Sequence, residues 1–364
     1  MNLRVGQTIT CLLAGLFIFS IPRLSASSEH GRVTVKAKVG VEYDDNVFEE
    51  IEDRTGGLAA RCYLGLTSTL FRSKRVLTSL RYHGALKRPL SSPSGDSLSA
   101  AEPIVHSLTL SHGHKLTERL VAAIEGEIKS RTLMNKGSTF LPSQDGYLQG
   151  AAGLSLKVRL AGDLAGNFSY RRSFVHFGEF RDFDFRAQEA GIHLNKRLSG
   201  RLTCRLGGSW KRLNFDRHAL TQGLQLAEDR QKDTVQRIGV HFKFYRLFLI
   251  DGGYCFLRNT SNSYGYAFDA HRWTLVLGKM LTRRIGLQLY GVFQRKNYTE
   301  DIRDIPLISP PKDMEGSVFV VKGSGDITDR WGIEVQYGLH REESLQRNRF
   351  HTRSLYSSSL SLRF

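Results

Sequence analysis

The last twelve residues of the chain, Arg353 to Phe364, read RSLYSSSLSLRF and decide the fold. One face of this stretch is mostly apolar and carries Tyr356, Ser358, Leu360, Leu362 and Phe364, whereas the other face carries Ser357, Ser359, Ser361 and Arg363. An alternation with a period of two residues predicts a β-strand with two unlike sides. Both edges of such a strand must be paired, and the first strand of the chain is the simplest partner for the free edge. The stretch therefore predicts a sheet that closes into a barrel, with Phe364 at the closing terminus.

Similar alternating segments recur along the whole chain. Near its start, Val33, Val35 and Val39 share one face, and Lys36 and Lys38 share the other. We predict about sixteen strands, within a range of about 14 to 18. Their expected positions are 32–43, 57–70, 74–86, 104–113, 118–130, 147–160, 163–174, 185–196, 201–213, 233–244, 247–258, 267–279, 284–297, 316–326, 330–341 and 353–364.

The connections between these strands alternate between short and long. Five short connections share the pattern apolar, small, variable, charged, apolar, which is turn chemistry between two strands. They are 116–120, 160–164, 198–202, 281–285 and 327–331. The long connections are polar and lie at 44–56, 87–103, 131–146, 175–184, 214–232, 259–266, 298–315 and 342–352. A β-propeller has a similar repeat of about 40–45 residues, but each of its blades holds four short strands, and here two long strands fill the repeat.

The two faces of the strands indicate a membrane barrel rather than a soluble sandwich. In a sandwich the apolar faces meet in a core, whereas in a membrane barrel they face lipid. Here the polar faces are heavily charged, the apolar faces contain Gly, Ala and Ser, and aromatic residues cluster near strand ends, where an aromatic girdle lies. We therefore predict an all-β fold, a closed up-and-down antiparallel transmembrane β-barrel with short periplasmic turns and long extracellular loops. No stretch approaches the ~18 consecutive apolar residues of a transmembrane helix.

The first 27 residues have the parts of a secretory signal peptide. Arg4 supplies the positive charge, Ile9 to Ile21 supply a short apolar region, and Ser25, Ala26 and Ser27 supply small residues for cleavage. An uncleaved anchor is the alternative. We expect residues 28–364 to form the barrel and to reside in the cell outer membrane.

The charge of the chain indicates what passes through the barrel. The formal net charge is +17, which suggests an anionic partner; export argues against nucleic acid. The predicted pore-lining basic residues are Arg32, Lys36, Lys38, Arg61, Arg81, Lys129, Lys157, Arg159, Arg171, Arg201, Arg205, Lys211, Arg237, Lys243, Arg272 and Arg284. They predict a porin-like channel that prefers anions. In the alternative interpretation these charges only form salt-bridge ladders along the wall. Loops 87–103 and 214–232 are the candidates for an inward constriction.

Two segments carry a resemblance to known families. Val41 to Phe48 reads VEYDDNVF and resembles the start of type 2 β-barrel porins, which are often encoded with exopolysaccharide export machinery. The final strand ending in Phe364 resembles the closing strand of Gram-negative outer-membrane β-barrels. The resemblance implies a conduit for acidic polysaccharide or small anionic solutes. From the residues alone, Asp44, Asp45 and Asn46 are turn residues, with a rim calcium site as the alternative.

Other residues with reactive side chains give weaker indications. Cys62, Cys204 and Cys255 are far apart and are interpreted as single thiols. His112 and His114 have no third ligand nearby and are interpreted as solvated rather than metal-binding. His106 or His271 could act as the base of a lipid- or lipopolysaccharide-modifying enzyme, which is one alternative function, and a structural or adhesion barrel is another.

The sequence thus predicts a transport protein rather than an enzyme, with no catalytic, cofactor-binding or metal-binding residues. The expected partners are outer-membrane lipid and an anionic solute or polysaccharide. Periplasmic export partners and the choice between monomer and trimer stay open.

Overall fold

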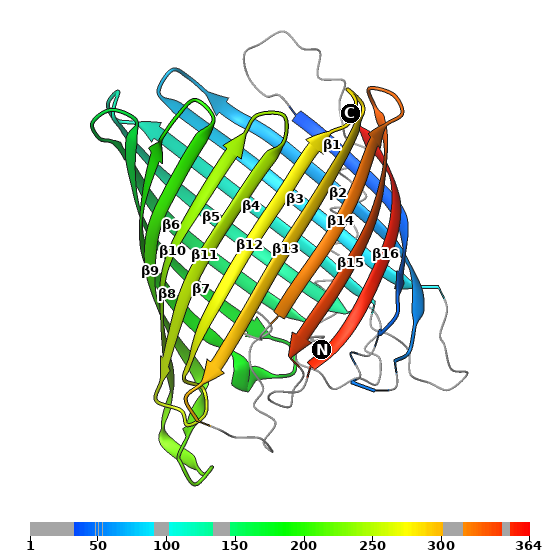
Figure 1. The fold of residues 1–364 in the computed structure, drawn as a ribbon. Helices are drawn as coiled ribbons and strands as arrows, with labels where there is room; N and C mark the ends of the chain where they lie inside the picture. The colour runs from blue at the N-terminus through cyan, green and yellow to red at the C-terminus, as the bar shows by residue number, and fades with distance from the viewer. Residues whose placement is uncertain are drawn as a thin grey trace.

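The computed structural model describes residues 33–47, 49, 51–52, 54–90, 102–133, 146–300, 316–343 and 350–364. These residues form one closed antiparallel barrel of sixteen strands, in which each strand pairs with its neighbours in the chain (Figure 1). The strands are β1 (Val33–Asp44), β2 (Gly57–Arg72), β3 (Val76–Pro89), β4 (Pro103–Lys115), β5 (Leu120–Leu133), β6 (Tyr147–Arg159), β7 (Leu164–Phe177), β8 (Phe185–Arg197), β9 (Leu202–Leu220), β10 (Leu226–Tyr245), β11 (Leu249–Ser261), β12 (Phe268–Met280), β13 (Ile285–Tyr298), β14 (Gly316–Asp326), β15 (Trp331–Glu343) and β16 (Phe350–Arg363). A single turn of 3-10 helix, η2 (Arg181–Phe183), lies between β7 and β8. The predicted fold and strand number are confirmed.

The first and last strands close the barrel, as the C-terminal stretch predicts. β1 pairs with β16 in an unbroken antiparallel register from Lys36 opposite Arg363 to Asp44 opposite Leu355. The pairing continues at the terminus, because the backbone N–H of Phe364 donates to the carbonyl of Val35 at 2.9 Å. The line along which β1 meets β16 is called the seam below. No strand edge is left open there, as a sheet in hydrocarbon requires.

The apolar faces of the strands form the outside of the barrel. Ile124, Ile128 and Ile238 are more than half exposed at 56%, 59% and 59%, although a soluble protein would bury such residues. The alternate positions face the concave inner side. There Lys38 on β1 reaches Glu334 on β15 across the intervening β16, which is feasible only where side chains converge. The large aliphatic side chains therefore do not meet in a dry centre, and the outer wall is apolar as a lipid-facing surface must be.

The five short connections with a shared sequence pattern also share a structure. In each of them the N–H of the first residue donates to the carbonyl of the fifth, at 2.8–2.9 Å. Three of the turns have a second contact, in which the hydroxyl of Ser199, Thr282 or Thr328 accepts from the N–H three residues later, at 3.0–3.1 Å. The small hydroxyl residue therefore has a defined role in these turns.

The expectation that residues 214–232 form an inward loop is wrong. β9 and β10 extend through this segment and meet at residues 221–225, where the N–H of Thr221 donates to the carbonyl of Gln225 at 2.9 Å. The hairpin projects beyond the other strands at the end where the long connections lie (Figure 1). The strands continue into this hairpin because one of its faces stays buried, with Phe215 at 2%, Ala219 at 1% and Gln231 at 1% exposure. The other candidate for a constriction is loop 87–103, of which residues 91–101 lie outside the described part of the chain.

The segment between β7 and β8 packs onto the inner side of the barrel instead. Asp184 fixes it, because its side chain accepts from the N–H of Phe177 at 2.7 Å and lies 2.9 Å from Nδ1 of His176. This places Phe183 in a buried cluster with Val175 and Phe177. A second buried cluster consists of Ala187, Leu213, Phe215 and Val235. Both clusters lie at the long-loop end of the barrel, on β7 to β10.

The described residues contain no helix that is long and apolar enough to cross a membrane. Residues 1–27 lie outside the described part of the chain, so the signal peptide stays a prediction.

Candidate functional site: the charged inner wall

A pair of lysines and one glutamate join the seam strands on the inner side. Glu334 on β15 lies 3.0 Å from Nζ of Lys38 on β1 and 2.7 Å from Nζ of Lys322 on β14. All three side chains are only 20–30% exposed. Because one carboxylate serves two ammonium groups, this part of the wall keeps an excess of positive charge.

A second network lies nearer the long-loop end of the same seam. Glu42 on β1 pairs with Arg61, and its Oε1 lies 3.0 Å from Nζ of Lys87. Asp44 lies two positions further along the strand and is 3.8 Å from both Lys87 and Arg353. Glu42 and Asp44 are nearly fully buried, at 5% and 2% exposure. Buried carboxylates need such partners, because removing a charge from water is costly.

Further ion pairs follow the inner wall away from the seam. Arg171 on β7 reaches across β6 to Glu127 on β5, and to Glu125 at 3.3 Å. On β8 to β11, Arg237 lies 3.8 Å from Glu189, and Nε2 of His241 lies 2.5 Å from Asp251. The predicted wall salt bridges are therefore present.

These pairs do not neutralise the inner wall. A set of inward cations has no ion pair with any carboxylate in the described part of the chain: Lys36, Arg81, Lys157, Arg159, Lys243 and Arg272. They come from β1, β3, β6, β10 and β12, so they are distributed around the barrel rather than gathered on one strand. Most carboxylates of the wall, such as Glu42, Glu127 and Glu334, already have cationic partners, so these six cations add positive charge to the wall.

The predicted pore-lining residues fall into three groups. Most lie within strands, at positions that alternate with exposed apolar residues: Lys36, Lys38, Arg61, Arg81, Lys129, Lys157, Arg159, Arg171, Arg205, Lys211, Arg237, Lys243 and Arg272. Arg201 and Arg284 lie in short turns, one residue before β9 and β13, and so stand at the rim. Arg32 lies outside the described residues.

Not every cation of the barrel faces inward. On β7 to β9 the register places Arg172, Arg186 and Arg212 on the outer face, next to the cross-strand residue Gln188. All three arginines are exposed. They lie toward the long-loop end, where arginine side chains can reach the polar headgroup region of a bilayer.

The histidines considered for catalysis or metal binding lie on the outer face. Nδ1 of His106 lies 2.8 Å from the hydroxyl of Tyr82, and Nδ1 of His271 lies 2.8 Å from the hydroxyl of Tyr254. Among the described residues neither imidazole has a hydrogen bond with a serine hydroxyl. Nδ1 of His112 lies 2.9 Å from the hydroxyl of Thr78. The arrangement thus places each of these imidazoles beside a single hydroxyl group.

The segment that follows β1 forms a hydrogen-bonded turn. The N–H of Asn46 donates to Asp44 Oδ1 at 3.1 Å, and Asp45 accepts from the N–H of Ser354 on β16. The amide of Asn46 also donates to the carbonyl of Thr352 at 3.1 Å. These contacts support the turn interpretation of Asp44, Asp45 and Asn46, and they attach the turn to the last strand.

Sequence reasoning missed two groups of side chains at the long-loop end. The guanidinium of Arg217 lies over the rings of Phe183, Phe215 and Tyr266, at 4.6–5.0 Å. Glu49, Glu342 and His351 bring their side chains together beside the seam. All of these residues except Phe183 and Phe215 are charged or titratable, but each lies in a segment whose polar composition predicted a loop. The alternation Phe215, Arg217, Ala219 was the one available signal for the first group.

Comparisons with known proteins identify the fold and nothing finer. No family model and no curated protein matches the chain, so the resemblance to type 2 β-barrel porins stays a prediction. The structure is similar to that of an anion-selective porin from Comamonas acidovorans, with a TM-score of 0.51 at 8% identity, over 92% of this chain and 99% of that one. It is also similar to OmpT of Vibrio cholerae, with a TM-score of 0.49 at 10% identity, over 93% and 99% of the two chains. The likeness to the porin therefore shows a shared barrel fold.

Proposed function

We propose that this protein is an outer-membrane channel whose basic interior favours anions. The observation that carries the proposal is the set of inward cations that form no ion pair within the described part of the chain: Lys36, Arg81, Lys157, Arg159, Lys243 and Arg272. Charges kept only for wall stability would be matched by carboxylates, as Lys38 is by Glu334. The excess of positive charge needs another counter-ion, and dissolved anions supply it.

The size of the barrel supports a water-filled path. Barrels of 16–18 strands are too wide for side chains to fill and leave an aqueous channel. A low-dielectric wall around this water focuses the field of the unpaired cations, so the local concentration of anions rises and that of cations falls. The porin from Comamonas acidovorans that is described as anion-selective has a similar fold, so a barrel of this kind is compatible with an anion-selective channel.

The nature of the anion is the finer part of the proposal. Small anionic solutes suit a wall whose unpaired cations are spread over several strands, because each cation can be a separate brief binding site. An acidic polysaccharide would need to contact many of them at once. The inward segment at Phe183 and the apolar cluster around Phe215 occupy one side of the long-loop end, and we expect them to narrow the entrance there. Small anions are therefore the first substrates to test, and acidic oligosaccharides the second.

Planar-bilayer recording tests the proposal directly. The purified barrel is inserted between unequal KCl solutions, and the reversal potential reports the ratio of chloride to potassium permeability. We expect stable conductance steps and a ratio above one. The double variant Lys157→Gln, Lys243→Gln removes two unpaired inner charges and should bring the ratio closer to one.

A matched control separates the effect of the inner charges on the permeability ratio from the effect of the protein's net charge. Lys279 lies near the short-turn end of β12 on the outer face and is exposed, so Lys279→Gln should leave the permeability ratio unchanged. A preference for cations in the unmodified barrel would overturn the proposal. Adding an acidic oligosaccharide then distinguishes the two substrate classes, since a permeating or binding polymer interrupts the current in discrete blocks and a small-anion pore shows none.

Placement in the outer membrane and the signal peptide at residues 1–27 belong to the same proposal. The apolar outer wall supports the first, because such a surface is stable only in lipid or detergent. Sequencing the N-terminus of the mature protein from the outer-membrane fraction tests both, with a start at about residue 28 as the expected result.

A further inference from the structure

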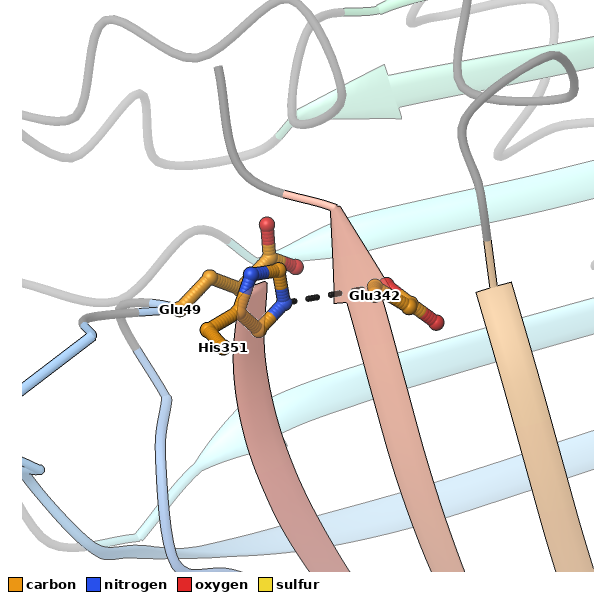
Figure 2. Close-up of side chains that lie close together, drawn as sticks. All are labelled: Glu49, Glu342 and His351. Atoms are coloured by element: carbon orange, nitrogen blue, oxygen red, sulfur yellow. Dashed lines mark ion pairs between the residues drawn. The ribbon is translucent and has the colours of Figure 1, made fainter. Parts of the chain in front are cut away.

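Three side chains, one from near the start of the chain and two from near its end, converge at the long-loop end of the seam (Figure 2). Glu49 lies in the segment after β1, Glu342 lies near the end of β15, and His351 lies near the start of β16. One carboxylate oxygen of each glutamate and one ring nitrogen of the histidine all lie within 4.8 Å of one another. None of the three belongs to the predicted pore-lining residues.

His351 gives an independent indication that this cluster has a ligand. The residue is only 3% exposed, and both of its ring nitrogens are buried without a hydrogen-bond partner among the described residues. Its nearest charged neighbour is Glu342, whose Oε2 lies 3.8 Å from Nε2, beyond hydrogen-bond distance. Buried polar groups are nearly always paired, because an unpaired one costs about 1–3 kcal/mol. The imidazole of His351 lies between the carboxylates of Glu49 and Glu342, too far from Glu342 for a hydrogen bond. Three such side chains around a common point are arranged like the protein ligands of a metal ion.

We propose that Glu49, Glu342 and His351 bind a divalent transition-metal ion, with Zn²⁺ as the ion that the donor set fits best. Zinc accepts imidazole nitrogen together with carboxylate oxygen, and sites with three protein ligands leave a fourth position for water. Calcium and magnesium prefer sets made of oxygen alone, so the histidine argues against them. The proposal does not depend on the channel function.

The distances require only a small contraction. Tetrahedral ligands at about 2.0–2.2 Å from zinc are separated from one another by about 3.3–3.6 Å. The observed limit of 4.8 Å is larger, and rotation of the glutamate side chains can close the difference. Glu342 is already oriented for this, since its Oε1 lies 3.7 Å from Nδ1 of His340 while Oε2 faces His351. The oxygen that does not bind the metal thus faces a second histidine.

The surrounding charges are compatible with a cation. Arg353 lies 3.4 Å from Oε1 of Glu49 and 3.8 Å from Oδ2 of Asp44. When Glu49 binds a metal ion, Arg353 keeps Asp44 as its counter-ion. The carboxylate of Asp44 lies on the same inner face and offsets the arginine.

The backbone at Glu49 indicates that its position is imposed by its surroundings. Its φ of 59° lies in the left-handed region, which residues other than glycine rarely adopt. A metal ion bound by Glu49, Glu342 and His351 would join the segment after β1 to the two last strands, at the place where the barrel closes. Binding should therefore stabilise the seam as well as occupy the site.

Metal titration of the full refolded barrel in detergent tests the inference. After treatment with a chelator, the protein is dialysed against Zn²⁺, and bound metal is measured by mass spectrometry. We expect one ion per barrel and a higher unfolding temperature with zinc than with chelator. The variants His351→Asn and Glu342→Gln should each weaken binding at least about 100-fold, since each removes a direct ligand.

Matched controls come from the same inner wall. His193→Asn and Glu189→Gln change a histidine and a glutamate on β8 and should bind zinc like the unmodified protein. Co²⁺ supplies a spectroscopic readout that a purely structural role would not give, because a site with nitrogen and oxygen ligands in tetrahedral geometry shows visible absorption. Should His351→Asn disturb folding, Glu49→Gln, in the segment outside the strands, serves as the second ligand variant.

Two results would overturn the inference. One is zinc binding no tighter than millimolar in the unmodified barrel. The other is binding that the ligand variants leave unchanged, which would place the metal elsewhere. Conductance is measured separately, so failure of the metal site and failure of the channel proposal are distinguishable.

Discussion

The inner wall at the long-loop end is built in two different ways on opposite sides of the barrel. At the seam of β15, β16 and β1, the inward positions hold Glu42, Asp44, Glu342, His351 and Arg353, which form a dense network of charges. On β7 to β10, most inward positions are apolar and pack into buried clusters around Phe183 and Phe215, beside a smaller polar group of Arg217, Gln231 and Asp233. Both sides have the same alternation along their strands, and they differ in what stabilises the buried face.

The comparison shows that the inner face of a wide barrel is not one environment. Apolar packing excludes water, so its stability should be insensitive to salt. A network of charges depends on each partner, and dissolved ions screen it where its side chains are partly exposed, as Glu334, Lys38 and Lys322 are. The apolar side is therefore expected to be the more rigid support, and the charged seam the more responsive to ions.

The largest effect is expected from removing the centre of the apolar side. Phe215 is 2% exposed, and Phe215→Ala should lower the free energy of unfolding by about 3–5 kcal/mol, because it leaves a cavity in a packed cluster. Chemical denaturation in detergent micelles measures the change. Phe293→Ala is the matched control, because this phenylalanine is 55% exposed on the outer face and leaves no enclosed cavity. Equal losses for the two variants would show that the inner cluster is not a packed core.

The seam should be most sensitive where its two strands approach each other closely. A Cβ on Gly40 would lie 2.2 Å from the carbonyl oxygen of Ser358, so Gly40→Ala forces the backbones of β1 and β16 apart. We expect a loss of about 1–3 kcal/mol and slower closure of the barrel during refolding. Gly126→Ala is the control, because nothing lies within 4 Å of its added Cβ. Refolding followed by gel mobility of unheated samples measures closure, and normal closure in Gly40→Ala would contradict the expected clash.

The comparison also explains which parts of the structure the sequence predicts. Strand number and most boundaries follow from alternation, because lipid outside and water inside impose opposite chemistry on neighbouring residues. The rule weakens beyond the membrane. In the hairpin of β9 and β10, Asn214, Asp216 and His218 replace the apolar outer row, so the segment was predicted to be a loop although Phe215 and Ala219 continue the inner one.

The contacts of the inner wall were not predictable to the same degree. Lys38 and Glu334 are separated by 296 positions, and only closure of the barrel brings them together. His351 was assigned to the loop 342–352 because the predicted last strand began at residue 353, whereas β16 begins at Phe350. The residue types on the inner face could be predicted, but their partners depend on the register between the first and last strands.

A charged contact at the seam should respond to salt in a way that the apolar side does not. Glu334→Gln leaves Lys38 and Lys322 facing each other, and we expect a loss of about 1–2 kcal/mol at low ionic strength. Since the side chains are 20–30% exposed, the loss should shrink by more than half in 1 M salt. Unfolding of Glu334→Gln and Phe215→Ala at both salt concentrations measures the contrast. A penalty for Glu334→Gln that salt leaves unchanged would mean that the pair is shielded from water and that the two sides are alike.

The smallest effect concerns the one prominent cation on the apolar side. Arg217 stacks on Phe183, Phe215 and Tyr266 and donates from Nε to Gln231 Oε1 at 2.7 Å. Arg217→Lys keeps the charge and removes the planar group, so a loss of about 0.5–2 kcal/mol is expected from weaker stacking. Because stacking on aromatic rings in a buried site is little screened, this loss should be the same in low and high salt. Unchanged stability in Arg217→Lys would show instead that Arg217 acts through its charge, which lysine keeps, and the apolar side would then depend on ions in the same way as the seam.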